Sequence, residues 1–184
     1  MPLAAPARND SPRLRVRLIE EADLEALMAV NGDAEVTRFL PYATWKSMDD
    51  ARAWFARMAG LQSAGNALQF VVVDKSSGSA IGTCLLFRFD EIHGQAELGF
   101  VLGRSHWGGG YMREALACLL DAAFGAMALR RLDAQVDPRN AASRVLLQRL
   151  GFTREGLLRE RYIEKGAPCD IELFGLLSRE WRHA

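Results

Sequence analysis

A run of glycines between a strand-like segment and a helix-like segment contains the residues best suited to chemistry in this chain. Glu97 to Leu102 leads through a short connection into Trp107-Gly108-Gly109-Gly110-Tyr111-Met112, and a helical pattern follows. Three successive glycines leave backbone N–H groups without side chains to shield them. A helix that begins at once adds unpaired N–H groups and the positive end of its dipole. Trp107 to Met112 is therefore predicted to cradle a pyrophosphate.

The glycines could also belong to a phosphate loop, a dinucleotide-binding fold or a simple tight turn. The phosphate loop of nucleotide-binding proteins has Lys followed by Ser or Thr after its last glycine, whereas Tyr111 and Met112 follow here. A dinucleotide-binding fold places its glycines near the first strand of a βαβ unit, whereas this loop lies beyond the middle of 184 residues. Neither pattern fits well. A simple tight turn stays open beside the pyrophosphate cradle.

Hydrophobic periodicity predicts the elements that must position this loop. Leu14, Val16 and Leu18 alternate with arginines, which is the period of a half-buried strand. Apolar faces with helical spacing follow at Ala22–Val30 and Asp49–Leu61. The remaining expected elements are helices at Arg113–Met127 and Asn140–Leu150 and strands at Leu68–Asp74, Ala80–Phe89, Ala96–Leu102, Arg131–Val136, Phe152–Leu157 and Ile171–Leu177.

Composition limits the classes of protein that need to be considered. A length of 184 residues with 49% hydrophobic side chains suits one domain, expected at residues 13–184 behind a disordered tail at 1–12. The 23 basic and 23 acidic side chains balance, so no overall field favours nucleic acid or a membrane surface. No signal peptide or membrane-spanning segment is recognisable.

The cysteines give no sign of a metal or redox site. Cys84, Cys118 and Cys169 are widely spaced and form no CxxC pair, and this pattern favours a reducing cytoplasm. Cys84 and Cys118 lie among apolar residues and are expected in the core. Cys169 is expected to be more exposed, in a loop before Asp170. None of the three is assigned to catalysis.

Short motifs spread over nearly the whole chain accompany the glycine loop. They are Leu14-Arg15-Val16-Arg17-Leu18, Glu35-Val36-Thr37-Arg38-Phe39-Leu40-Pro41, Ile81-Gly82, Glu97-Leu98-Gly99-Phe100, Trp107-Gly108-Gly109-Gly110-Tyr111 with Glu114-Ala115, Asn140-Ala141-Ala142-Ser143, Leu150-Gly151-Phe152, Glu155-Gly156 and Asp170. Each motif alone is modest, but their order and spacing are specific. Together they resemble the GNAT superfamily of N-acetyltransferases, and within it the branch of the RimJ and RimL ribosomal-protein acetyltransferases.

The resemblance implies a mixed α/β fold whose central, mostly antiparallel sheet is splayed near its middle and flanked by helices. It also implies that acetyl-CoA enters between the strand that ends at Leu102 and the strand that ends at Val136. The cofactor-binding residues would be Phe100, Val101 and Leu102 for the pantetheine arm, Trp107, Gly108, Gly109, Gly110, Tyr111 and Met112 for the pyrophosphate, and Asn140 and Ser143 for the arm and sulfur. The superfamily often has Gln or Arg three residues before its paired glycines. Ser105 stands there, beside Arg104, so phosphate binding would rest mainly on backbone donors.

The activity implied is direct transfer of an acetyl group from acetyl-CoA to a primary amine, without a metal and without an acyl-enzyme. Such a transfer needs a base for the amine and an acid for the thiolate. Glu97 is the expected base, with a structural ion pair as its alternative role and His93 and His106 as alternative bases. Ser143 is the expected acid, because Leu147 stands where many members have a tyrosine. Its alternative role is to cap the helix that Asn140 starts.

The acceptor amine is left open by the sequence. It could be a protein N-terminus, such as that of a ribosomal protein, or a small-molecule amine. The acceptor cleft is expected at Pro41 to Trp45 and in a loop from Arg159 to Asp170, with Tyr42, Trp45 and Tyr162 as its aromatic side chains. The assembly is expected to be a monomer or a homodimer. The main alternative function is a catalytically silent acyl-CoA-binding or regulatory protein of the same fold, and an interaction module without cofactor would leave the glycine loop unexplained.

Overall fold

A mixed sheet of eight strands runs through the computed structural model, which describes residues 9–182. The strands lie in the order β1-β2-β3-β4-β5-β6-β8-β7, and all neighbours are antiparallel except β5 and β6. Their bounds are β1 Asn9–Asp10, β2 Leu14–Leu18, β3 Ala67–Asp74, β4 Ala80–Asp90, β5 Gln95–Leu102, β6 Arg131–Val136, β7 Thr153–Glu164 and β8 Ala167–Leu177. The sequence resemblance predicted this mixed, mostly antiparallel sheet, and the prediction is confirmed.

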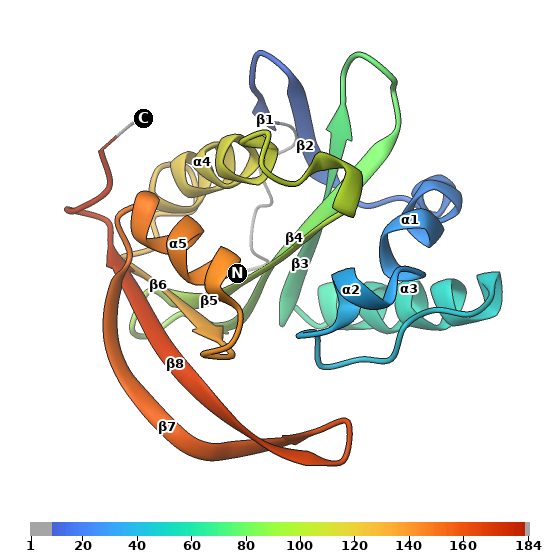
Figure 1. Ribbon diagram of the computed structural model, residues 1–184. Helices are drawn as coiled ribbons and strands as arrows, with labels where there is room; N and C mark the ends of the chain where they lie inside the picture. Colours follow the sequence, from blue (N-terminus) through green and yellow to red (C-terminus); the bar gives the residue numbers. More distant parts are fainter. Residues whose placement is uncertain (1–8, 183–184) are drawn as a thin grey trace.

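Helices cover both faces of the sheet (Figure 1). They are α1 Leu24–Asn31, α2 Ala34–Thr37, α3 Met48–Ser63, α4 Tyr111–Phe124 and α5 Ala141–Arg149, with 3-10 turns η1 Glu21–Asp23 and η2 Arg104–His106. Ser47 and Asp50 form a capping box at the start of α3, which satisfies backbone N–H groups that the first turn would leave unpaired. Within residues 9–182, every helix falls short of the length or apolar character that a membrane crossing requires.

The central strand β3 is buried on both faces, and each face belongs to a separate hydrophobic core. Leu68, Phe70 and Val72 pack in the core that α4 and α5 cover. Val71 and Val73 pack in the core that α1, α2 and α3 cover. Successive strand residues point to opposite faces. The continuous apolar run of β3 therefore fills both cores at once.

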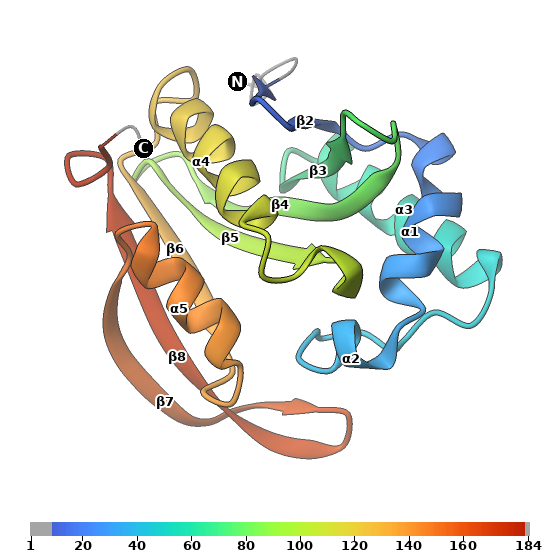
Figure 2. The same cartoon turned by 45° about the horizontal axis from the view of Figure 1, so that its top comes forward.

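The sheet divides between β5 and β6 (Figure 2). These two parallel strands pair only at Gln95, Ala96 and Glu97, opposite Arg131, Leu132 and Asp133. Beyond Glu97 each strand keeps its antiparallel partner on the other side, β4 for β5 and β8 for β6. The second half of β5 therefore presents an edge that β6 does not cover. This is the splay that the resemblance implied.

The predicted strands and helices are present, with bounds shifted by at most a few residues at most ends. The expected loop from Arg159 to Asp170 is wrong, because β7 and β8 continue through it as a long hairpin. Most β7 side chains are exposed, so the segment lacks the apolar alternation from which a strand is recognised. In the expected disordered tail, Asn9 and Asp10 pair with β2, and residues 1–8 lie outside the described residues.

Candidate active site

The glycine loop joins η2 to α4 in a conformation that suits exposed backbone donors. Gly108 and Gly110 have φ values of 75° and 76°, in the left-handed region where side chains are strained. Gly110 is the N-cap of α4 and makes no side-chain capping bond. The first N–H groups of α4 consequently have no intrahelical partner. Met112 is buried in the core, so it can serve a ligand only through its backbone.

An arginine directly before β2 contacts the loop. The Arg13 guanidinium donates from Nη1 to the Gly109 carbonyl at 3.0 Å and from Nε to Glu114 Oε2 at 2.7 Å. It also lies 4.2 Å from the centre of the Tyr111 ring. Sequence reasoning missed Arg13, because an arginine that alternates with apolar residues in a strand is ordinarily a solvated side chain. The nearby Glu114-Ala115 motif was the available signal for its partner.

Two further contacts fix the approach to the loop. The Trp107 indole Nε1 donates to the Leu102 carbonyl at 2.8 Å, which ties the loop to the end of β5. Arg104 Nε lies 2.9 Å from Asp33 Oδ2, so this guanidinium is engaged with the N-cap of α2. The Arg104 guanidinium is thus occupied by Asp33, and the prediction that phosphate binding rests mainly on backbone donors stays a prediction.

The edge of β5 divides the predicted pantetheine-binding residues into two groups. Peptide groups of successive strand residues point to opposite edges. The Gly103 N–H donates to the Ile81 carbonyl on the β4 side at 2.8 Å. Because the direction alternates along the strand, the peptide groups of Phe100 and Leu102 face the opposite edge, where β5 and β6 diverge. The peptide group of Val101 faces β4, and only its side chain lines the cavity described below.

Glu97 lies where β5 and β6 separate, since Glu97 and Asp133 form their last pair. Its side chain is 12% exposed. Glu97 Oε2 accepts from Arg88 Nη1 at 2.7 Å and from Gln135 Nε2 at 3.2 Å. Burial raises the pKa of Glu97 above its usual value, while the bond from Arg88 opposes that shift. Both of the alternatives for Glu97 are thus visible in the geometry: a carboxylate held in an ion pair and a base with a raised pKa.

Arg88, Gln135 and Tyr162 complete the surroundings of Glu97. The Tyr162 hydroxyl donates to Gln135 Oε1 at 3.0 Å, which orients the amide so that its nitrogen faces Glu97. Arg88 has a φ of 53°, next to a register shift between β4 and β5. Arg88 and Gln135 were not identified from the sequence. They lie 9 and 38 positions from Glu97, and no local pattern connects them.

On the other side of the divergence, Asn140 and Ser143 begin α5. Asn140 Oδ1 accepts from the Ser143 N–H at 3.1 Å, so the capping oxygen comes from Asn140 and not from the Ser143 hydroxyl. Leu147 is buried within the core. The Ser143 side chain lines the cavity, whereas Leu147 does not appear among the described residues that line it.

A cavity of about 550 Å³ brings seven of the fifteen predicted site residues together, and the residues of the glycine loop are not among the described residues that line it. The predicted residues that line it are Tyr42, Glu97, Phe100, Val101, Asn140, Ser143 and Tyr162. Trp45 is not among the described residues around it. Its side chain is 5% exposed and packs against Trp54, with ring centres 5.3 Å apart. Trp45 therefore shapes the cavity wall indirectly, by supporting Trp54.

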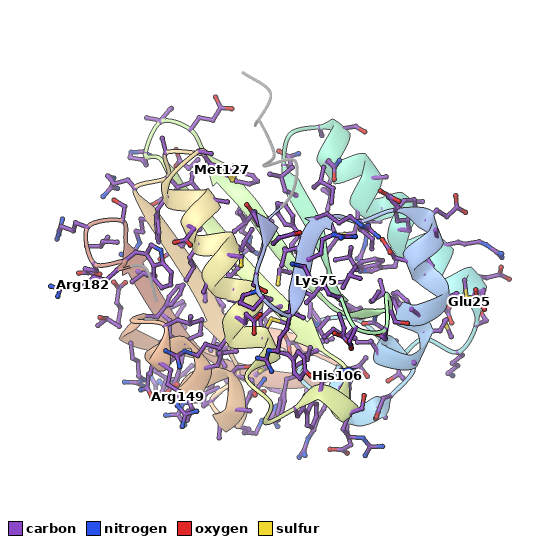
Figure 3. The ribbon with its side chains drawn as sticks, turned by 90° about the horizontal axis from the view of Figure 1, so that it is seen from above. Glu25, Lys75, His106, Met127, Arg149 and Arg182 are labelled. Carbon is purple, nitrogen blue, oxygen red and sulfur yellow. The ribbon has the colours of Figure 1, made fainter. Side chains whose placement is uncertain are left out.

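The two histidines lie away from the cavity. His93 Nδ1 is 2.8 Å from Asp90 Oδ2 in a turn between β4 and β5. His106 packs edge-on against Tyr111 near the start of α4, with ring centres 5.4 Å apart, and Figure 3 shows it in the loop before that helix. Neither lines the cavity among residues 9–182. Within the same residues, no cluster of His, Cys, Asp and Glu could hold a metal ion.

The expected exposure of Cys169 is wrong. Its side chain is 4% exposed, because the hairpin that replaces the expected loop turns it inward. Cys169 Sγ donates to Asp137 Oδ2 at 3.2 Å. Burial, followed by the contact with Asp137, raises the pKa of the thiol to about 11. A thiol that stays protonated at neutral pH is a poor nucleophile.

Comparison with known proteins identifies the family of the chain. The acetyltransferase (GNAT) domain family matches residues 13–153. The uncharacterized N-acetyltransferase p20 of Bacillus licheniformis is 37% identical over 169 residues, covering 92% of this chain and 95% of that protein. The solved structure of ribosomal-protein-S5-alanine acetyltransferase from Vibrio fischeri is 26% identical, with a TM-score of 0.77 over 96% of this chain and 100% of that one.

A further solved structure shares the fold at lower identity. Spermidine N-acetyltransferase from Vibrio cholerae, solved in complex with CoA and spermine, superimposes with a TM-score of 0.80 at 23% identity. It covers 92% of this chain and 98% of its own. With the splayed sheet, the glycine loop and the family match over residues 13–153, the chain belongs to the GNAT family of N-acetyltransferases.

Proposed function

We propose that this N-acetyltransferase transfers an acetyl group from acetyl-CoA directly to a primary amine. The observation that carries the proposal is the cavity that opens at the divergence of β5 and β6. Glu97, at the last β5–β6 pair, and Ser143, in the first turn of α5, both line it. A base and an acid that line one space suit a reaction that removes one proton and supplies another.

The residues present fit acetyl-CoA. The loop at Trp107 to Met112 offers backbone donors and a helix N-terminus for the pyrophosphate. The peptide groups of Phe100 and Leu102 face the uncovered edge of β5, where an extended pantetheine arm can pair as an added strand. Since the Leu102 carbonyl already accepts from Trp107, Phe100 supplies the freer pairing position. Bound acetyl-CoA supplies the thioester that is attacked.

Glu97 is proposed to take the proton of the incoming ammonium, directly or through a water molecule. Among residues 9–182, the hydrogen bonds from Arg88 and Gln135 both end on Glu97 Oε2. Oε1 is therefore left to accept a proton. Because burial raises the pKa of Glu97, the carboxylate is a stronger base than an exposed glutamate. The neutral amine then attacks the thioester carbon.

Charge that develops during the transfer needs two further groups. A backbone N–H at Phe100 or Leu102 is proposed to stabilise the oxyanion. The Ser143 hydroxyl is proposed to donate its proton to the departing CoA thiolate and to regain the proton that the attacking nitrogen loses as the amide forms. Direct transfer without an acyl-enzyme agrees with the cysteines. Cys84 is fully buried, and Cys169 is held protonated beside Asp137.

The acceptor is proposed to be an amine of a protein N-terminus or of a small molecule. The relatives support both, since one acts on ribosomal protein S5 and another on spermidine. The three cysteines are free, which supports a reducing cytoplasm as the compartment of the reaction.

Release of CoA thiol tests the proposed activity. The full chain is mixed with acetyl-CoA and a panel of amines and N-terminal peptides, and thiol formation above the hydrolysis rate is expected for at least one acceptor. A catalytically silent acyl-CoA-binding protein predicts a different result. Acetyl-CoA would then raise the unfolding temperature, but no acceptor would be acetylated. That result would overturn the enzymatic proposal and leave the ligand assignment in place.

A further inference from the structure

The tip of the β7–β8 hairpin is fastened to the end of α2. Lys165 and Gly166 form the two-residue turn of the hairpin, with φ values of 50° and 83°. Lys165 Nζ donates to the Thr37 carbonyl at 2.7 Å and to the Arg38 carbonyl at 3.1 Å. These are carbonyls at a helix end, where a cation is favoured. We call this contact the Lys165 clasp.

The α2 side of the clasp is itself firmly held. Thr37 is fully buried, and its hydroxyl lies 2.6 Å from that of Thr44. The Thr37 hydroxyl also lies 3.2 Å from the Asp33 carbonyl. The Lys165 ammonium therefore bonds carbonyls whose positions are fixed by the segment around them.

The Lys165 clasp bridges two opposite walls of the cavity. One wall is Phe39 to Tyr42, directly after α2, and the other is Tyr162 to Lys165 on the hairpin. Figure 2 shows the hairpin tip turned toward α2. The clasp therefore ties two segments that line the cavity to each other. A polypeptide that entered between these segments would have to displace the contact, whereas a small amine needs less space between them.

The charges that line the cavity argue against an acceptor with several ammonium groups. Glu97 is engaged by Arg88 and Gln135. Asp137 accepts from Arg139 Nε at 2.9 Å. The third carboxylate in the lining is Glu164, next to the Lys165 ammonium in the chain.

Arg57 adds a positive charge to the same lining. A polyamine would bring further positive charges toward this guanidinium, with two of the three carboxylates already paired. Like charges at short range oppose binding.

The remaining walls are apolar and aromatic. The side chains that form them at the acceptor end include Leu40, Trp54, Met58, Leu85 and Phe87. An apolar substituent gains free energy when such walls remove it from water. A single ammonium on the acceptor can therefore pair with Glu97, and the rest of the acceptor contacts apolar side chains.

We propose that the acceptor is a small amine with a single positive charge and an apolar body, and that the Lys165 clasp excludes polypeptide N-termini. The inference rests on the proposed function and names the acceptor class for that site. It separates this chain from relatives whose acceptors are a ribosomal protein or spermidine.

Three acceptors test the inference with the full chain and saturating acetyl-CoA. They are phenethylamine, spermidine and an unblocked hexapeptide that begins with alanine, and kcat/KM is measured by CoA thiol release. Phenethylamine is expected to exceed both others at least tenfold. Lys165→Met keeps the aliphatic stem but loses the donors, and it is expected to raise the ratio of hexapeptide to phenethylamine at least threefold. Lys46→Ala, at an exposed lysine away from the cavity lining, is the matched control and should leave the ratio unchanged.

Opposite outcomes are distinguishable. Wild-type turnover of the hexapeptide or spermidine equal to that of phenethylamine would overturn the acceptor class and still support acetyl transfer. The acceptor class would also be overturned if Lys165→Met left the ratio of hexapeptide to phenethylamine kcat/KM unchanged while its unfolding temperature stayed near that of the wild type. Should that variant unfold early, the wild-type comparison of the three acceptors still decides. Failure of acetyl-CoA to raise the unfolding temperature would overturn the proposed function itself.

Discussion

The side chains around Glu97 show how single residues tune one carboxylate in opposite directions. Burial raises the pKa of Glu97, and the Arg88 guanidinium lowers it. The net rise makes the carboxylate a better proton acceptor than an exposed glutamate. Glu97 itself could be predicted from its place before the glycine loop. Arg88 and Gln135 could not, because a bulge and a strand pairing bring them there from distant positions.

Glu97→Gln is expected to lower turnover most at low pH. Without a base, only the small neutral fraction of an amine whose pKa is about 10 can react. This neutral fraction grows with pH. The ratio of wild-type to variant kcat/KM, measured across pH, should therefore fall as pH rises. The pKa of Glu97 is raised in the folded protein. The stability that its titration contributes is therefore present at pH values below its pKa in the unfolded chain. It is lost as the pH rises through its pKa in the folded protein. At neutral pH the variant should thus unfold no earlier than the wild type. A parallel pH profile in both proteins would remove Glu97 from the mechanism.

Ser143→Ala is expected to reduce kcat by about tenfold or more while acetyl-CoA affinity stays nearly unchanged. The Ser143 hydroxyl would act only as the sulfur gains charge, so its loss affects the transition state and hardly the ground state. The helix cap comes from the Asn140 side chain. Stability should therefore change little in Ser143→Ala, whereas Asn140→Ala should lose about 1 kcal/mol. Kinetics and unfolding are measured on both variants. Wild-type turnover in Ser143→Ala would assign protonation of the thiolate to water.

At the scale of elements, local sequence signals located the glycine loop and failed on the hairpin. The structure has positive φ values at Gly108 and Gly110 and a helix that begins at Tyr111. A run of glycines before a helical pattern is typical of such a loop, because few other structures require glycine at these positions. The β7–β8 hairpin follows from no such signal. Most β7 side chains are exposed, so pairing with β8 and the clasp at α2 determine its path. Those contacts are long-range and lie outside any local window.

Replacing Gly108 and Gly110 together with Val is expected to weaken acetyl-CoA binding at least tenfold. A left-handed φ costs a β-branched side chain roughly 1–2 kcal/mol at each position, and the side chains would cover the backbone donors. Gly78→Val is the matched control, because Gly78 also has a positive φ of 72° in an exposed turn with open space around it. Calorimetry should show normal affinity in the control. Unchanged affinity in the double variant would show that the loop does not bind the ligand.

At the scale of the whole molecule, the two halves of the sheet meet in only three residue pairs between β5 and β6. The family resemblance predicted this division. The side-chain network across it, from Arg88 through Glu97 and Gln135 to Tyr162, was beyond prediction. It depends on the angle at which the halves separate. That angle depends on packing in the core under α4 and α5, which contains residues of both halves, and not on any one segment.

Acetyl-CoA is expected to join the two halves, and amide hydrogen exchange can detect this. A ligand that pairs with the edge of β5 and contacts the start of α5 should slow exchange at Phe100, at Tyr111 to Arg113 and at Ser143. At about 100 times its Kd it should also stabilise the fold globally by about 2.7 kcal/mol. Exchange at residues 71–73 of β3, which are buried and are not among the described residues that line the cavity, should slow only through that global term. Local slowing confined to α4, with none at Phe100 or Ser143, would show that the ligand binds the glycine loop without bridging the sheet.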